Sequence, residues 1–228
     1  MRIIIALLLL SYNSFGLNKE ERIKIGAVLG ITGGLYIYDQ RIKDFSQEHR
    51  NLTSDKIASF AKPFGDGRYT LPPLALFYLY GHFYEDKRAE EVALLSMKSF
   101  VLSGAFTQII KFTTGRHRPN TGDKYNTWDG PHIPFSNDSF PSGHSSSAFA
   151  IATVFASEYK GIIPSLAYSI ATLCALSRIN DNCHWASDVF FGSCLGYFTA
   201  KGIIGLKKAN YAFKVDRVNG LLVSYNFW

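Results

Sequence analysis

The segment from Ser177 to Asp188 carries the residue types of a histidine nucleophile. His184 and Asp188 are four residues apart, so on a helix they would lie on one face. A carboxylate that holds one imidazole nitrogen fixes the tautomer and leaves the other nitrogen free to attack. Arg178, just upstream, adds a cation for an anionic substrate. His–Asp pairs on helix surfaces also occur by chance, so this segment alone decides little.

A second segment, Phe140 to Ser147, predicts an anion site at the start of a helix. Pro141 and Gly143 favour a sharp turn, and the apolar run from Ala148 indicates that a helix begins here. The first amides of a helix lack internal partners and attract anions. His144, in the first turn, would stand beside that anion and could donate a proton. A serine-rich N-cap with an incidental histidine is the alternative.

The third segment, Lys111 to Pro119, offers two cations. Lys111 and Arg118 are seven residues apart, which on a helix is close to two turns and places them on nearly the same face. Pro119 disfavours helical geometry for Arg118 and predicts the end of the helix there. Two cations on one face suit a dianionic phosphate. Taken alone, such a pair is typical of a solvated stripe.

The three segments together contain each part that in-line phosphoryl transfer needs. Their patterns are Lys-x6-Arg-Pro, Pro-Ser-Gly-His and Ser-Arg-x5-His-x3-Asp, in that order. They resemble the tripartite signature of the type 2 phosphatidic acid phosphatase and vanadium haloperoxidase superfamily, and every defining position is matched. The motifs span residues 111–188, about a third of the chain; residues 1–90 and the tail lie outside the resemblance.

The resemblance implies an all-α helical bundle with its site at helix ends, and no metal ion or other cofactor in the phosphatases. It implies that His184 attacks phosphorus to give a phosphohistidine and that Asp188 orients it. His144 would protonate the leaving oxygen and then activate water. The phosphoryl oxygens would be held by five groups: Lys111, Arg118, Arg178, Ser142 and the Gly143 amide.

The expected function is therefore that of a metal-independent phosphatase for phosphomonoesters or pyrophosphates, with lipid phosphates preferred as substrates. An acid phosphatase for soluble monoesters is the first alternative. A vanadium haloperoxidase would use the same residues, but members with that activity resemble much longer chains. A non-catalytic envelope protein that binds anionic lipid is disfavoured because all motif residues are intact.

The elements that must position these residues are apolar helices joined by short polar loops. Pro63, Pro72, Pro73, Pro119 and Pro164 fall at the proposed boundaries. The stretch 120–140 has no helical period and predicts a long loop. The expected helices are Lys19–Tyr38, Ser54–Ala61, Leu71–Tyr84, Lys87–Thr114, Gly143–Tyr159, Ile162–Leu176 and His184–Leu206.

We expect the chain to consist of three parts. Residues 1–16 resemble a secretory signal peptide, with Arg2, an apolar run from Ile3 to Leu10, and small residues at Ser14 and Gly16. Residues 17–210 form the helical domain. Residues 211–228 form a tail whose alternating pattern around Asn219-Gly220 predicts a short β-hairpin.

The composition and the N-terminal segment indicate the compartment and the binding partners of the protein. A signal peptide implies export to the periplasm or cell envelope, where two of the three cysteines (Cys174, Cys183, Cys194) could be bridged; three small buried thiols are the alternative. The net charge of +6 suits an anionic substrate or membrane surface, but scattered Lys and Arg give no nucleic-acid motif. Apolar runs of about 14–19 residues favour a soluble or peripherally bound domain over a membrane-spanning one.

Overall fold

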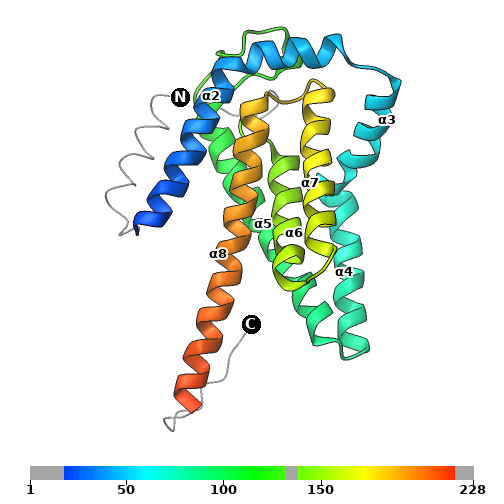
Figure 1. The fold of residues 1–228 in the computed structure, drawn as a ribbon, viewed down its shortest axis with the longest axis vertical. Helices are drawn as coiled ribbons and strands as arrows, with labels where there is room; N and C mark the ends of the chain where they lie inside the picture. The colour runs from blue at the N-terminus through cyan, green and yellow to red at the C-terminus, as the bar shows by residue number, and fades with distance from the viewer. Residues whose placement is uncertain (1–17, 132–137, 219–228) are drawn as a thin grey trace.

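The computed structural model describes residues 18–131 and 138–218, which form seven α-helices and two short 3-10 helices with no strand among them. The expected all-α class is confirmed. Figure 1 shows the helices running largely along one axis. In chain order they are α2 (Lys19–Glu48), α3 (Leu52–Ala61), η1 (Lys62–Gly65), α4 (Gly67–Phe83), α5 (Lys87–Thr114), η2 (Pro119–Thr121), α6 (Gly143–Glu158), α7 (Ile163–Asn180) and α8 (Ala186–Val218).

Short polar residues set several helix starts. Asp86 accepts hydrogen bonds from the amides of Arg88 and Ala89 and so begins α5. Ser142 accepts one from the Ser145 amide and begins α6. These side chains satisfy amides that have no partner within the helix, which fixes where each helix begins. The α5 and α6 bounds matter most, because both helices carry motif residues.

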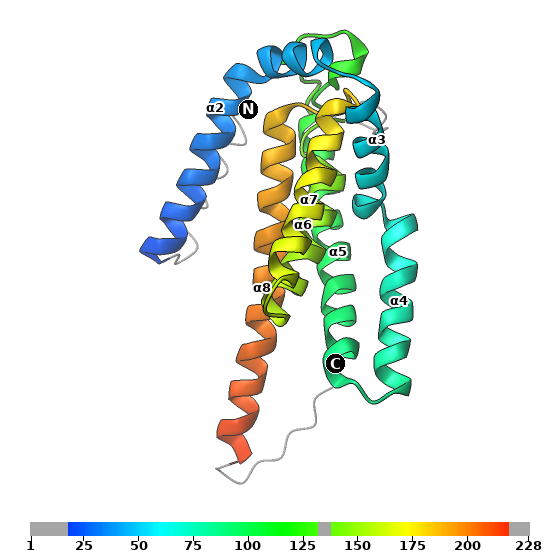
Figure 2. The same ribbon diagram turned by 45° about the vertical axis from the view of Figure 1, so that its right-hand side comes forward.

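Helix α6 lies at the centre of the bundle and contacts α5, α7 and α8. Helix α4 packs against α5, and α3 packs against α7. Helices α5 and α7 run towards one end of the bundle, whereas α6 and α8 run away from it (Figure 1). The last turns of α5 and α7 and the first turns of α6 and α8 therefore meet there; we call this the motif end. The second half of α2 crosses over it, as Figure 2 shows.

Small residues line the interior, and large apolar residues face outward. Ser96, Ser99 and Ser103 are fully buried along one face of α5. On α8, Gly192 and Gly196 lie against the backbone of α6 so closely that a Cβ on either would collide with it. Exposed large apolar side chains include Val101, Phe106, Ile109, Leu166, Leu173, Phe198 and Leu206. The helices thus approach closely through small side chains.

Two helices are long and apolar enough to cross a membrane: Lys87–Thr114, and Ala186–Lys207 within α8. Only 33% of each apolar window is buried inside the protein. The sequence favoured a soluble or peripherally bound domain, because its apolar stretches are mostly about 14–19 residues long and a membrane span needs about 20. By length and composition, these two helices are possible spans.

Several expected boundaries are corrected. Pro72 and Pro73 lie inside α4, because Asp66 caps that helix and starts it before them. Residues 213–218 continue helix α8 instead of forming the first strand of the expected hairpin; the alternation there involves only Phe213 and Val215. The rest of the hairpin and the expected signal peptide (1–16) lie outside the described residues. Pro63, Pro119 and Pro164 do stand in the first turns of their elements.

Candidate active site

Lys111 and Arg118 converge on one carbonyl group at the motif end. Lys111, buried in the last turn of α5, donates from Nζ to the carbonyl oxygens of Asp138 (2.6 Å) and Ser139 (3.4 Å). The Arg118 Nε donates to the same Asp138 carbonyl at 3.4 Å. Both cations therefore stand together, as the sequence predicted.

The predicted reason for that pairing was wrong. Helix α5 ends at Thr114, because Gly115 takes a left-handed conformation (φ 56°, ψ 40°) that favours glycine. Arg118 then has an extended backbone (φ −78°, ψ 153°) outside any α-helix. The loop folds back and brings Arg118 to the site, whereas the sequence placed both cations on one helical face.

His184 precedes α8 and is held through its Nδ1 atom. That atom lies 2.8 Å from the carbonyl oxygen of Ser139. A carbonyl only accepts hydrogen bonds, so this contact requires the proton on Nδ1 and leaves Nε2 unprotonated. The Asp188 Oδ2 lies 3.9 Å from the same nitrogen. The Ser139 carbonyl thus occupies the hydrogen-bonding place that the sequence predicted for the Asp188 carboxylate.

Asp188 instead organises the polypeptide around His184. Its Oδ2 accepts hydrogen bonds from Ser139 Oγ at 2.5 Å and from the Trp185 amide at 2.9 Å. Its Oδ1 accepts one from Arg116. The Asp188 backbone carbonyl accepts a hydrogen bond from the Ser142 amide at 3.0 Å, which ties the start of α6 to the first turn of α8. Asp188 therefore connects the two histidine-bearing segments.

His144 lies in the first turn of α6, as predicted. Its backbone faces Gly65 of η1, where a Cβ would come within 2.5 Å of the His144 carbonyl oxygen. Only glycine fits at that approach, so η1 presses directly on the turn that carries His144. The start of α6 is thus fixed by Asp188 on one side and by Gly65 on the other.

Arg178 closes the site from the last turn of α7. Its guanidinium donates to Asp181 Oδ2 at 3.1 Å, while its buried Nε has no hydrogen-bond partner among the described residues. Its carbonyl accepts from the amides of Cys183 (3.0 Å) and His184 (3.3 Å). A buried N–H without a partner is costly unless a ligand satisfies it, which an anion at this position would do.

The electrostatics keep both imidazoles neutral. Burial lowers the pKa of His184 well below its ordinary value, and the positive charges of Lys111, Arg118 and Arg178 lower it further. Burial, aided by Arg178, lowers the pKa of His144 to about 4, while Asp66 opposes the shift. A neutral ring at His184 is a nucleophile, and the surrounding cations favour a bound dianion.

Sequence reasoning missed Ser139, Arg116 and Asp39, all fully buried at this site. Arg116 lies inside the Lys-x6-Arg motif, where its position was treated as variable. Asp39 gives no signal in the sequence, because it lies in α2, far from every motif. Cys174, Cys183 and Cys194 are all free thiols. In the described parts of the chain, no three His, Cys, Asp or Glu side chains are placed to hold a metal ion.

Comparison with known proteins agrees with this geometry. The family model described as PAP2 superfamily matches residues 93–211, over half of the chain. The lipid A 1-phosphatase of Porphyromonas gingivalis is 40% identical over 98 residues, which is 42% of this chain and 19% of that protein. This chain's matches span between 19% and 62% of the length of three curated relatives.

Two solved structures share the fold. The transmembrane PAP2-type phosphatidylglycerolphosphate phosphatase of Bacillus subtilis is 20% identical, with a TM-score of 0.59 over 80% of this chain and 95% of that one. Aquifex aeolicus LpxE is 21% identical, with a TM-score of 0.55 over 73% of this chain and 94% of that one. At these identities the likeness concerns the fold alone.

Proposed function

The chain belongs to the PAP2 superfamily, and on that premise we propose that it is a phosphatase for lipid phosphomonoesters or pyrophosphates. The observation that carries the proposal is the motif end itself. One buried imidazole (His184), one half-buried imidazole (His144) and three cations, drawn from α5, α6, α7 and the loops beside them, act on one another at this end. A tetrahedral dianion is the ligand that this set of charges suits best.

The proposed reaction has two steps. His184 Nε2 attacks phosphorus, the bond from phosphorus to the lipid oxygen breaks, and His144 gives that oxygen a proton. Water then loses a proton to His144 and attacks the phosphohistidine, which releases phosphate and restores His184. The pKa of His144 is lowered to about 4, so the bound dianion must supply the negative charge that favours its protonation.

The three cations would hold the phosphoryl oxygens. Lys111 and Arg118 share the Asp138 carbonyl, and the N–H of the Arg178 Nε has no hydrogen-bond partner within the described part of the chain. Ser142 and the Gly143 amide add donors at the start of α6, where the helix dipole also favours an anion. Charge that develops on these oxygens in the transition state would thus meet fixed donors.

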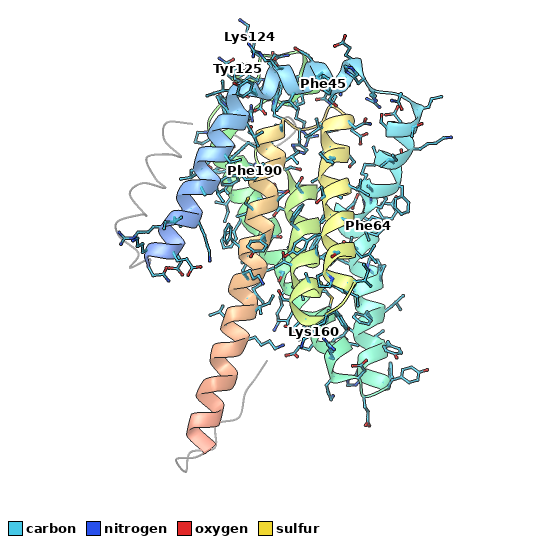
Figure 3. The ribbon with its side chains drawn as sticks, in the orientation of Figure 1. Phe45, Phe64, Lys124, Tyr125, Lys160 and Phe190 are labelled. Carbon is cyan, nitrogen blue, oxygen red and sulfur yellow. The ribbon has the colours of Figure 1, made fainter. Side chains whose placement is uncertain are left out.

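An apolar cavity supports a lipid substrate. It has a volume of about 350 Å³ and lies between α4, α6 and α7. Ala148 in its wall stands one turn after His144 on α6, and Phe64, labelled in Figure 3, lines it at the junction between α3 and α4. A hydrocarbon chain in this cavity would leave its phosphate near the motif end. The names of the relatives, lipid A 1-phosphatase among them, agree with such a substrate.

The arrangement of side chains supports a place in a membrane. Small residues pack between the helices while large apolar ones face outward, which is the pattern of helices that associate in lipid. We propose that α5 and the Ala186–Lys207 part of α8 cross a membrane. Two lysines labelled in Figure 3 lie at opposite ends of the bundle: Lys124 lies at the motif end, and Lys160 lies beside the α6–α7 turn at the other end. Export through the N-terminal segment would place the protein in the cell envelope.

The test is phosphate release in detergent micelles with EDTA present. Phosphatidic acid, phosphatidylglycerophosphate, an isoprenyl pyrophosphate and p-nitrophenyl phosphate would be compared at equal concentration. We expect release from the lipids to exceed release from the soluble ester, and His184→Ala to abolish it. His82→Ala is the matched control, because His82 is exposed on α4 away from the site.

Each alternative has its own outcome. Release from the soluble ester alone would replace the lipid substrate with a soluble one. Peroxide-dependent bromide oxidation after vanadate loading, without phosphate release, would indicate a haloperoxidase. Binding of anionic vesicles without release from any ester would indicate a non-catalytic protein and would end the proposal.

A further inference from the structure

A buried ion cluster includes Asp188. It joins Asp39 of α2, Arg116 of the α5–α6 loop and Asp188 of α8, and each of the three side chains is fully buried. Arg116 Nη2 donates to Asp39 Oδ2 at 2.7 Å, and Nη1 donates to Asp188 Oδ1. One guanidinium thus bridges two carboxylates that lie 149 positions apart in the sequence.

Further contacts prevent the guanidinium from moving. Its Nε and Nη2 donate to the Tyr125 carbonyl at 3.1 and 2.8 Å. Three aromatic rings surround its carbon atom, those of Tyr36 (4.9 Å), Trp128 (5.0 Å) and Trp185 (5.4 Å). Rings at these distances both attract a cation and exclude water. The guanidinium of Arg116 is therefore held by hydrogen bonds and enclosed by aromatic rings.

Asp39 completes the cluster from a helix that carries no motif residue. Its two oxygens accept hydrogen bonds from the Ser187 amide (2.9 Å), the Ser187 hydroxyl and Arg116. The second half of α2 crosses the motif end, and this brings Asp39 within reach (Figure 2). Both carboxylate oxygens of Asp39 are thus bonded to groups that adjoin Asp188: its chain neighbour Ser187 and its ion-pair partner Arg116.

The contacts continue from Arg116 to the proposed nucleophile. With Oδ1 of Asp188 held by Arg116, Oδ2 points at Ser139 Oγ, 2.5 Å away. The carbonyl of the same Ser139 accepts the Nδ1 proton of His184 at 2.8 Å. A displacement of Asp188 would move Ser139, and the proton on Nδ1 would lose its acceptor.

We propose that Arg116, anchored by Asp39, is a positioning residue that fixes Asp188 and Ser139 and so keeps the proton of His184 on Nδ1. The catalytic consequence rests on the function proposed above; the effect on the tautomer does not. A purely structural cluster that fastens α2 to the bundle is the competing explanation. The two differ in whether the loss of Asp39 is felt at the imidazole.

The first measurement is the tautomer of His184, read from the nitrogen chemical shifts of ¹⁵N-histidine-labelled protein in micelles. We expect the Nδ1–H form in the wild type, and a rise of the Nε2–H form in Asp39→Asn and in Arg116→Lys. Asp39→Asn keeps the shape of the side chain, and Asp44→Asn is the matched control, since Asp44 is an exposed carboxylate on the same helix. This readout needs no turnover, so it separates this proposal from the proposed function.

The second measurement is a double-mutant cycle on kcat. We expect Asp39→Asn to lower kcat by about 10- to 1,000-fold, by analogy with loss of an orienting carboxylate, with little change in KM. In the Asp188→Asn background the same substitution should have almost no effect, because residues that act as a unit are not additive. Arg116→Lys keeps the charge but loses the fork, so it should follow Asp39→Asn.

Two results would overturn the proposal. An unchanged His184 tautomer in well-folded Asp39→Asn, as judged by circular dichroism, leaves the cluster a structural fastening. If Asp39→Asn lowers kcat by the same factor in the wild-type and Asp188→Asn backgrounds, the cluster is likewise only a structural fastening. If the wild type releases no phosphate from any ester, the tautomer measurement still decides the matter.

Discussion

The contact between α6 and α8 can be tested at a single atom with Gly192→Ala. Gly192 lies against Ser142, the residue that caps α6 next to Gly143 and His144. An ideal Cβ at Gly192 would stand 2.5 Å from the Ser142 carbonyl oxygen and 3.2 Å from its amide nitrogen. The oxygen belongs to the backbone, so it has no side-chain rotamer to change; one of the two helices must move.

The size of the effect follows from that distance. Non-bonded heavy atoms come to rest at about 3.5 Å, so the helices must separate by about 1 Å locally. Overpacking of this kind costs about 1–3 kcal/mol, against which alanine gains about 0.5–1 kcal/mol over glycine within a helix. A displacement of about 1 Å at a reacting group can cost about 100-fold in rate. We therefore expect a modest loss of stability and a large loss of kcat.

The matched control is Gly202→Ala on the same helix, where a Cβ would meet no atom within 4 Å. It should raise stability by about 0.5–1 kcal/mol and leave kcat unchanged. The assay is phosphate release per mole of folded protein, with Tm measured in the same detergent. Wild-type kcat in Gly192→Ala would refute the claim that this contact positions the start of α6. Equal losses in both variants would show only that helix α8 tolerates no alanine.

Three further predictions concern the site and its loop. His184→Ala should abolish phosphate release with helical content intact by circular dichroism; near-normal turnover would contradict the proposed nucleophile. Arg178→Ala should weaken vanadate inhibition by about 10-fold or more, since a hydrogen bond to a charged group contributes about 1.5–3 kcal/mol; an unchanged inhibition constant would place the anion elsewhere. His117 bonds Asp123 and Asp129 at 2.8 Å each, and these carboxylates raise its pKa. The protonated His117 therefore stabilises the folded state fully below a pH of about 6.5, and this stabilisation is lost as the pH rises through the raised pKa of His117 in the folded state. The Tm gap between wild type and His117→Asn should shrink at alkaline pH, modestly because the carboxylates are half exposed; a gap that does not change with pH would contradict this.

The motif residues could be predicted from the sequence because the three motifs rarely occur together in one chain. The residue type of Ser142 and the apolar run that follows it predicted the start of a helix, and the structure confirms that start. His184 and Asp188 lie near each other as expected, with 3.9 Å between Nδ1 and Oδ2, although His184 precedes α8 and does not share a helical face with Asp188. Local sequence decides such features, since caps and residues a few positions apart depend on little else.

The other features of the candidate site depend on contacts between distant residues, which no local sequence pattern predicts. Lys111 and Arg118 were paired for the wrong reason, because Gly115 breaks the helix that the spacing assumed. The Ser139 carbonyl reaches His184 only through the fold of the loop. The contact between Asp39 and Arg116 joins residues 77 positions apart, and neither lies in a periodic pattern that would point to the other.

The mean hydropathy of the whole chain does not describe its individual helices. Mean hydropathy over the chain is only +0.01, which argued against membrane-spanning helices. Yet charged residues are frequent in α2 and at the helix ends, where Asp66, Asp86 and Asp181 lie, while α5 and α8 each contain an apolar window with a mean hydropathy of 1.4. A bundle whose proposed phosphate-binding cations lie at one end needs its charge there. The same arrangement therefore lowers the mean hydropathy of the chain without removing the apolar windows of α5 and α8.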